Sequence, residues 1–387
     1  MNSLTVYVKI KPDQVEDLRA ILKDINGNQN NNKYLHLKND KLTHCSRWVI
    51  VEEEEHGPDP RLLLAVEFDG ELDDYLEHQI QITPGLDEIW GHCEGYPGKA
   101  GFIDYIRKIA FPTQAFYIAF RDETVASIKS KIAVRQQLEA LLDAGGVGFR
   151  SVMTVLSRLP RVPGPWRDLR AFVEKTIADF HGAWMALVLA IVKPISQIGQ
   201  TKAYSRVTSF EDNPLTPRAQ KLTNIDGQMV TITTIKPWLY WRVRLAFLVN
   251  EFLGKHGWAP GQFADVGTLH SFSWVLIDNN KRLIFLSVFD GSWQNYMGDF
   301  IDKIIWALDG VYNNTFGYPK GGMADVLPFQ RWILNHQYEP QLLFKSYPDE
   351  TVLNLIRDRT SNTNLAATLE AGLALDSGKV RETLTAL

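Results

Sequence analysis

The feature that most constrains this chain is a short pattern that occurs twice. A His-x-x-x-Trp element stands at His44–Trp48 and again at His270–Trp274. Each copy is followed, in the same order, by Phe-Asp-Gly, at Phe68–Gly70 and at Phe289–Gly291. A repeat of this length has to be recognised before a fold is assigned, because each copy then predicts a similar unit.

The correspondence extends beyond the two elements in both directions. The offset is 221 residues between the Asp-Gly pairs and 227 between the last matching blocks. Collinear blocks at a nearly constant offset predict an internal duplication. The further matched blocks are Lys11-Pro12 with Lys236-Pro237, Gly95-Tyr-Pro97 with Gly317-Tyr-Pro319, and Phe120-Arg-Asp122 with Tyr347-Pro-Asp349.

Hydrophobic periodicity predicts the same order of elements in both copies. Alternating segments rich in β-branched residues favour strands, and apolar residues spaced three and four apart favour helices. The first copy predicts strands at 4–10, 44–52, 62–68 and 115–120, and helices at 14–25, 72–82 and 124–142. The second predicts strands at 228–235, 270–277, 283–289 and 342–346, and helices at 239–253, 293–308 and 351–360.

This order is that of the ferredoxin-like unit, in which helices cover one face of a four-stranded sheet. Two such units bury their bare faces against each other, so we expect an α+β fold in which they pair as an intramolecular barrel. The expected divisions are a first repeat at 1–144, a linker with an apolar helix at 145–227, a second repeat at 228–361 and a C-terminal tail at 362–387.

Two helical segments are unusually apolar. The run 183–192 has no polar face, which is typical of a helix in a core or in lipid. Its ten residues are too few to span a bilayer. We expect a core helix, and a peripheral membrane contact through 183–192 or a lid over an apolar pocket remain the alternatives. For 238–247, with Trp238, Trp241, Arg242 and Arg244, we expect a core-facing helix with exposed arginines, and a membrane interface is the alternative.

Bulk properties narrow the class of protein. The net charge of −4 over 387 residues gives no reason to expect a nucleic-acid partner. Two cysteines without a Cys-x-x-Cys motif fit a reducing compartment. The N-terminal residues show no basic region followed by an apolar core, so we expect no secretory leader. A cytoplasmic location follows, with association at a membrane surface as the alternative.

The duplicated polar residues are the candidate site. His44 and His270 begin equivalent strands, so we expect each to hydrogen-bond a neighbouring backbone group and fix the strand start. Because neutral imidazole is a common metal ligand, metal or haem-iron binding is the alternative. Asp69 and Asp290 each follow a strand and precede a helix, so we expect helix N-caps, with a general acid–base role as the alternative. Arg47 has Ser273 as its counterpart, so two such sites would differ.

Nucleotide-binding, zinc-protease and nucleophile-elbow motifs are absent from the sequence. The duplicated pattern resembles the dimeric α+β barrel superfamily, which includes chlorite-dismutase-like proteins and dye-decolourising peroxidases. The resemblance covers both repeats at the level of element order. The peroxidases carry Gly-x-x-Asp-Gly, and Val66–Gly70 and Ser287–Gly291 keep the Asp-Gly without the first glycine. The resemblance implies haem as cofactor, His270 as iron ligand and Asp69 or Asp290 as distal acid. His44 as a further cofactor-binding residue and Arg47 as a further catalytic residue complete the candidate site.

Three functions follow as expectations. The first is a barrel that binds or transforms an apolar small molecule, in keeping with the apolar linker and 11 tryptophans. The second is a haem-dependent, peroxidase-like oxidoreductase. The third is a non-catalytic structural or interaction protein. The sequence leaves the oligomeric state open.

Overall fold

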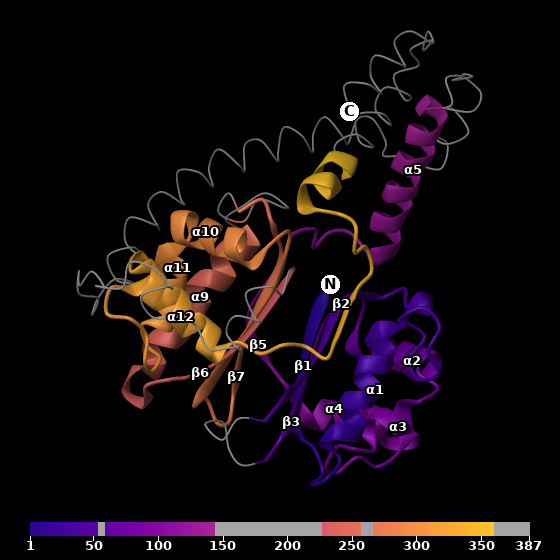
Figure 1. Ribbon diagram of the computed structural model, residues 1–387, viewed down its shortest axis with the longest axis horizontal. Helices are drawn as coiled ribbons and strands as arrows, with labels where there is room; N and C mark the ends of the chain where they lie inside the picture. The colour runs from indigo at the N-terminus through magenta and orange to yellow at the C-terminus, as the bar shows by residue number, and fades with distance from the viewer. Residues whose placement is uncertain (53–58, 144–226, 257–262, 264–265, 360–387) are drawn as a thin grey trace.

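The computed structural model describes residues 1–52, 59–143, 227–256, 263 and 266–359 (Figure 1). The apolar run 183–192 and the tail 362–387 lie outside these residues. The first half contains β1 (Asn2–Lys9), α1 (Val15–Gly27), β2 (Thr43–Val51), β3 (Arg61–Phe68), α2 (Leu72–Ile82), α3 (Leu86–Trp90), α4 (Phe102–Ile109), β4 (Ala110–Phe111), β5 (Thr113–Ile118) and α5 (Val125–Asp143). The second contains β6 (Gln228–Thr234), α9 (Tyr240–His256), β7 (Leu269–Ile277), β8 (Arg282–Phe289), α10 (Trp293–Lys303), α11 (Ile305–Tyr312), α12 (Val326–His336), β9 (Leu342–Lys345) and a helix at 352–359.

The strands form two antiparallel sheets, as an α+β fold requires. The first sheet has the order β4-β1-β3-β2-β9, and the second has the order β5-β7-β8-β6. Figure 1 shows α1 to α4 outside the first sheet and α9 to α12 outside the second, so the layers run helix, sheet, sheet, helix. Because both faces of each sheet are covered, the central strands read as nearly continuous apolar runs.

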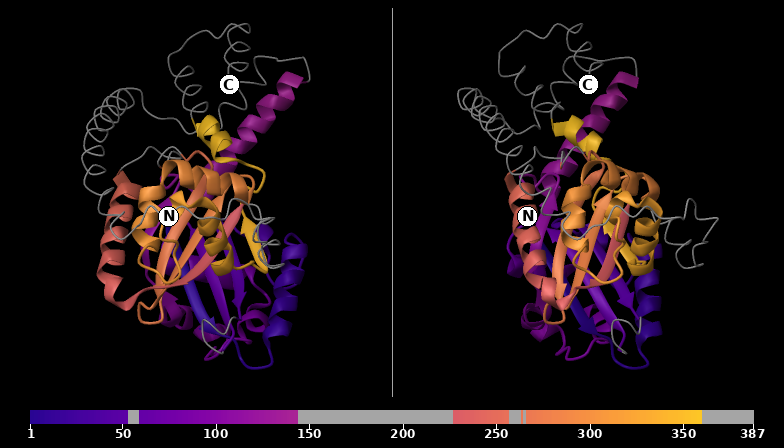
Figure 2. Two further views of the ribbon diagram at one scale, coloured as in Figure 1. Left: turned by 60° about the vertical axis from the view of Figure 1, so that its left-hand side comes forward. Right: turned by 90° about the vertical axis from the view of Figure 1, so that its left-hand side faces the viewer.

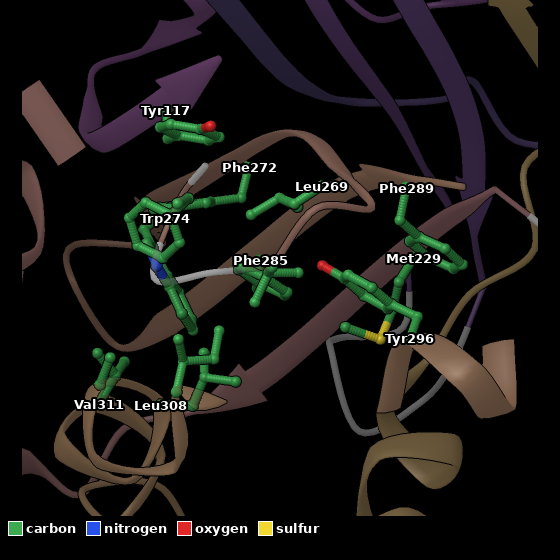
Figure 3. Packing of buried hydrophobic residues seen from close by; sticks show 14 of the residues in the cluster. Tyr117, Met229, Leu269, Phe272, Trp274, Phe285, Phe289, Tyr296, Leu308 and Val311 are labelled. Atoms are coloured by element: carbon green, nitrogen blue, oxygen red, sulfur yellow. The ribbon is translucent and has the colours of Figure 1, made fainter. Parts of the chain in front are cut away.

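Three apolar layers hold these elements together. One lies between the first sheet and its helices, and another, built around Trp274, lies between the second sheet and its helices. In the latter, Phe289 stacks on Tyr296 with ring centroids 3.7 Å apart, and Trp274 lies 4.3 Å from Phe285 (Figure 3). The third layer packs the sheets face to face through residues such as Val49 and Ile284. Each fully buried side chain of this size stabilises the fold by about 1.5–3 kcal/mol.

The last strand of each half pairs with the sheet of the other half. β5 pairs with β7, and β9 pairs with β2. Pro112 separates β4 in the first sheet from β5 in the second, and Pro340 separates Gln337, which bridges to β6, from β9. Proline has no N–H to donate, so it interrupts ladder pairing at each crossing. Within the described residues the sheets therefore remain separate, and the closed barrel that we expected is not confirmed.

Most predicted elements are present, and the differences lie in the helices. The predicted helix 293–308 is broken at Ile304 into α10 and α11. The short helices α3, α4 and α12 were not predicted. α4 buries Phe102, Tyr105 and Ile106 at helical spacing, but its eight residues follow a Gly- and Pro-rich turn that hides the periodicity.

Candidate active site between the two sheets

The two repeated histidines are placed by equivalent irregularities of their strands. The register of β2 against β3 shifts between Thr43 and Cys45, and that of β7 against β8 shifts between Leu269 and Ser271. His44 and His270 are therefore the extra residues of two β-bulges. A bulge bends the strand and re-aims the side chain at that position, which commonly occurs next to active sites.

Each histidine is hydrogen-bonded to the aspartate of its own half. His44 Nε2 lies 3.1 Å from Asp69 Oδ1, and His270 Nε2 lies 2.7 Å from Asp290 Oδ1. A carboxylate only accepts hydrogen bonds, so Nε2 carries the proton and donates in both pairs. In this tautomer each Nδ1 has a lone pair, which is the basic nitrogen of the ring.

The aspartates cap helices, but not the helices that we predicted. Asp69 Oδ2 accepts a 2.7 Å hydrogen bond from the Val125 amide at the start of α5. Asp290 Oδ2 accepts an equal bond from the Val352 amide, where the helix at 352–359 begins. The prediction that Asp69 caps the helix directly after it is wrong, because α2 has Glu71 at its N-cap position and no side-chain cap bond. Each aspartate thus joins its sheet to the helix that follows the exchanged strand.

Tyr347 makes the two histidines unequal. Its hydroxyl lies 2.8 Å from His44 Nδ1, so both nitrogens of His44 are engaged. The Tyr347 ring centroid lies 6.0 Å from the ring of His44 and 6.4 Å from that of His270. Among the described residues, His270 Nδ1 has no hydrogen-bond partner. Burial raises the pKa of Tyr347 far above its ordinary value, so its hydroxyl stays protonated and donates to His44.

Arg47 and Glu67 form a buried ion pair on the neighbouring strands β2 and β3. Arg47 Nη2 donates to Glu67 Oε1, and the two side chains are 0% and 2% exposed. Arg47 Nε and Nη1 and Glu67 Oε2 find no hydrogen-bond partner among the described residues. Arg47 and Glu67 are therefore buried ions with incomplete hydrogen bonding, an arrangement that costs several kcal/mol to assemble.

Cys45 and Lys345 complete the polar group. Burial, with the nearby Glu67 carboxylate, raises the pKa of the Cys45 thiol to about 12. Burial lowers the pKa of Lys345, against the opposing effects of Cys45 and Asp290. The Lys345 ammonium lies against Gly227, where a Cβ would be 2.6 Å from Nζ and φ is +74°. The positive φ favours glycine at that position, whereas the flexible Lys345 side chain can move away from an added Cβ.

The charged residues at these positions belong to the first sheet only. Cys45 lies opposite Glu67 and Lys345 in the first sheet. Its counterpart Ser271 lies opposite Val288 and Ile118 in the second. The matched positions, in the order first sheet and second sheet, are Cys45 and Ser271, Glu67 and Val288, Lys345 and Ile118, Arg47 and Ser273, and, just beyond the strands, Tyr347 and Phe120. At these positions the second sheet forms with small or apolar residues, so the backbone arrangement does not need the charges.

A cavity of about 20 Å³ lies among these side chains. Its polar lining includes His270, Lys345 and Tyr347, and its apolar wall includes Ile118 and Phe120. This volume holds about one water molecule.

A haem group does not fit this arrangement. A porphyrin is far larger than the cavity, and neither ring nitrogen of His44 is available to a metal. Arg47 does not line the cavity. The described residues contain no group of three or more His, Cys, Asp or Glu side chains placed to hold a metal ion. The assignment of haem iron to His270 is therefore not supported by the geometry.

A larger hollow of about 390 Å³ lies elsewhere, on the surface beside α12. It is lined by Gly317, Pro319, Arg331 and Trp332, among others. It brings no acid–base pair together, so the inter-sheet cavity remains the better candidate for chemistry. No helix among the described residues is long and apolar enough to cross a bilayer.

Sequence reasoning found His44, His270, Asp69, Asp290 and Arg47 but missed the groups around them. Glu67 was visible as a single charge within an apolar strand. Tyr347 and Phe120 were already aligned as counterparts, so their difference was readable. Lys345 could not be predicted from the sequence, because its place at the site depends on the pairing of β9 with the first sheet.

No family model, curated protein or solved structure matches this chain.

Proposed function

We propose that this protein binds and transforms a small molecule by general acid–base chemistry in the inter-sheet cavity, with His270 as the base. The observation that carries the proposal is the inequality of the two histidines. His44 Nδ1 accepts a hydrogen bond from Tyr347. His270 lines the cavity, and its Nδ1 has no hydrogen-bond partner among the described residues. A basic nitrogen held in one tautomer by a carboxylate is the usual arrangement of a catalytic histidine.

The other residues take supporting roles in this proposal. Asp290 holds the His270 tautomer and stabilises the imidazolium that forms when Nδ1 takes a proton. Lys345, whose pKa is lowered by burial, is the group at the cavity that can return a proton or balance a developing negative charge. Asp69 and His44 form the matching pair whose role is structural.

The cavity also limits the ligand. Its apolar wall, formed by Ile118, Ala119, Phe120 and Val288, favours a molecule that is mostly apolar. Its volume of about 20 Å³ admits one polar group, such as a hydroxyl or carbonyl, or a water molecule. We infer that the reacting group enters the cavity while the rest of the ligand lies outside it.

We also propose that the fold is a tandem duplication of a ferredoxin-like unit, in which the last strand of each unit pairs with the sheet of the other. The matching registers, bulges and crossing prolines support this view. In such a duplication one sheet is free to gain charged residues while the other keeps small or apolar residues at the same positions. A purely structural role for the site is the second candidate, since both aspartates cap helices. It does not explain why the buried charges Arg47 and Glu67 of the first sheet stand where the second sheet has Ser273 and Val288.

The test separates the base from the structural bond. In His270→Gln the amide nitrogen replaces Nε2 as donor to Asp290, but the basic nitrogen is lost. Purified wild type and variant are incubated with a mixture of small metabolites, and the mixture is compared by mass spectrometry before and after. We expect at least one compound to be consumed by wild type and by His44→Gln but not by His270→Gln. Equal consumption by wild type and His270→Gln, or none by wild type, would overturn the proposal.

A further inference from the structure

An apolar stripe runs along the exposed side of α9 and the turn before it. Trp238, Trp241, Leu245 and Leu248 are 65%, 64%, 44% and 63% exposed. Their spacing of three, four and three residues places them on one face of a helix. We expected a core-facing helix with exposed arginines here; α9 does face the core through Val243 and Phe247, but the two tryptophans of the segment face solvent.

The opposite side of α9 fixes it to the fold. Val243 and Phe247 are buried in the core of the second half, and Phe247 lies 5.9 Å from Trp274. Figure 2 shows α9 at the outer edge of the molecule in both views. The apolar stripe is therefore presented by a helix that is held in place, and its exposure is a property of the folded protein.

The apolar surface continues beyond the helix. Phe316, 46% exposed, makes an edge-on contact with Trp238, with ring centroids 6.1 Å apart. Contiguous apolar surface of this kind, rich in large aromatic residues, marks an interaction site in a soluble protein.

The charges around the stripe are mostly basic. Lys236, Arg242 and Arg244 lie in or next to the aromatic end of this segment, Lys320 follows Phe316 by four residues, and Glu251 lies towards the other end of α9. The Arg244 guanidinium lies over the Tyr240 ring at 6.0 Å and donates to its hydroxyl at 3.2 Å. Desolvation, reinforced by Arg242, lowers the pKa of Lys236. A surface that combines exposed tryptophan with arginine and lysine complements the boundary between acyl chains and anionic headgroups.

We propose that α9 binds the surface of an anionic lipid bilayer, with the apolar stripe entering the headgroup boundary and the basic residues meeting lipid phosphates. This contact lies on described residues and is distinct from the run 183–192 considered from sequence. It does not depend on the proposed chemistry of the inter-sheet cavity.

Vesicle flotation tests the proposal with a matched pair of variants. Leu248→Asp places a charge in the stripe, and Leu353→Asp places the same charge at an equally exposed leucine, 64% against 63%, in the helix at 352–359. With phosphatidylcholine–phosphatidylserine vesicles we expect Leu248→Asp to weaken binding about tenfold or more and Leu353→Asp to leave it unchanged. Binding should also fall in phosphatidylcholine alone and at high salt.

Several results would overturn the proposal. These are no binding of the wild-type protein to anionic vesicles, an equal effect of both variants, or loss of binding in Leu187→Asp but not in Leu248→Asp. The last result would assign the contact to 183–192. A wild-type dimer that Leu248→Asp dissociates, without vesicle binding, would show that the stripe is a protein interface. Circular dichroism of each variant confirms that the fold is retained.

Discussion

The Tyr347 hydroxyl donates a 2.8 Å hydrogen bond to Nδ1 of His44, and this bond joins the segment that follows β9 of one half to the bulge of the other. Phe120 occupies the matching position next to the second bulge, where the Ala119 amide bonds the His270 carbonyl as Ser346 bonds that of His44. This hydroxyl is therefore one of the groups that distinguish the surroundings of His44 from those of His270, together with Glu67 and Lys345.

Replacing that tyrosine measures the contribution of the bond. Tyr347→Phe leaves a buried imidazole nitrogen of His44 without its donor, so we expect a loss of about 1–2 kcal/mol in the free energy of unfolding. Urea unfolding checks this value. Phe120→Leu, a change at the counterpart position that removes no hydrogen bond, is the control for general disturbance of packing. An unchanged stability in Tyr347→Phe would contradict the role of the bond.

Asp69 accepts hydrogen bonds from His44 and from the first turn of α5, and its removal should destabilise both contacts. Asp69→Ala deletes the cap of α5 and leaves the His44 Nε2–H unpaired, which together cost about 2–4 kcal/mol. The amide of Val125 should exchange faster with solvent, while that of Val352 should not. Asp290→Ala should produce the reverse pattern. Hydrogen exchange followed by NMR distinguishes the two, and equal effects at both amides would refute the assignment of separate caps.

The buried pair of Arg47 and Glu67 should behave as a unit. Removing one partner, in Arg47→Met or Glu67→Leu, leaves the other charge buried without a counter-ion. We expect this to lower the free energy of unfolding by about 3–5 kcal/mol. The double variant, which replaces both ions by apolar side chains, should recover most of that loss. A double-mutant cycle by urea unfolding measures the coupling. Additive losses would show that the two side chains do not interact in solution.

Lys345 should make stability depend on pH in a defined window. Its pKa in the folded chain lies below the ordinary value of 10.5 because the charged form is partly desolvated. Between these two values the unfolded chain binds the extra proton, so stability rises with pH. At lower pH both states are charged and the folded state carries the full penalty. Lys345→Met should therefore stabilise the protein at pH 7, and the gain should shrink towards pH 10.5. A gain independent of pH would contradict this cause.

Much of the architecture was readable from local pattern. The strand predicted at 62–68 appears as β3, Arg61–Phe68, and the helix at 72–82 appears unchanged as α2. These segments carry their signal in the periodicity of their own residues. The bulges at His44 and His270 were not readable, because a bulge is defined by the partner strand.

The missing parts depend on contacts between distant residues. The sequence of β9 does not predict that it pairs with β2, about 300 residues earlier. That pairing brings Lys345 and Tyr347 to the site. The cap formed by Asp69 has the same origin, since Val125 lies 56 residues away. A residue type and a turn predict that a cap exists, but only the tertiary fold selects which helix receives it.

The most direct test is the protonation state of the two imidazoles, read from long-range proton–nitrogen NMR correlations of the nitrogen-15-labelled protein. His44 and His270 should both carry the proton on Nε2 at neutral pH. Only the Nδ1 signal of His44 should change in Tyr347→Phe, because His270 Nδ1 accepts no bond from that hydroxyl. Such spectra would establish a free basic nitrogen on His270. A proton on His270 Nδ1, or equal responses of both rings to Tyr347→Phe, would contradict its assignment as the base.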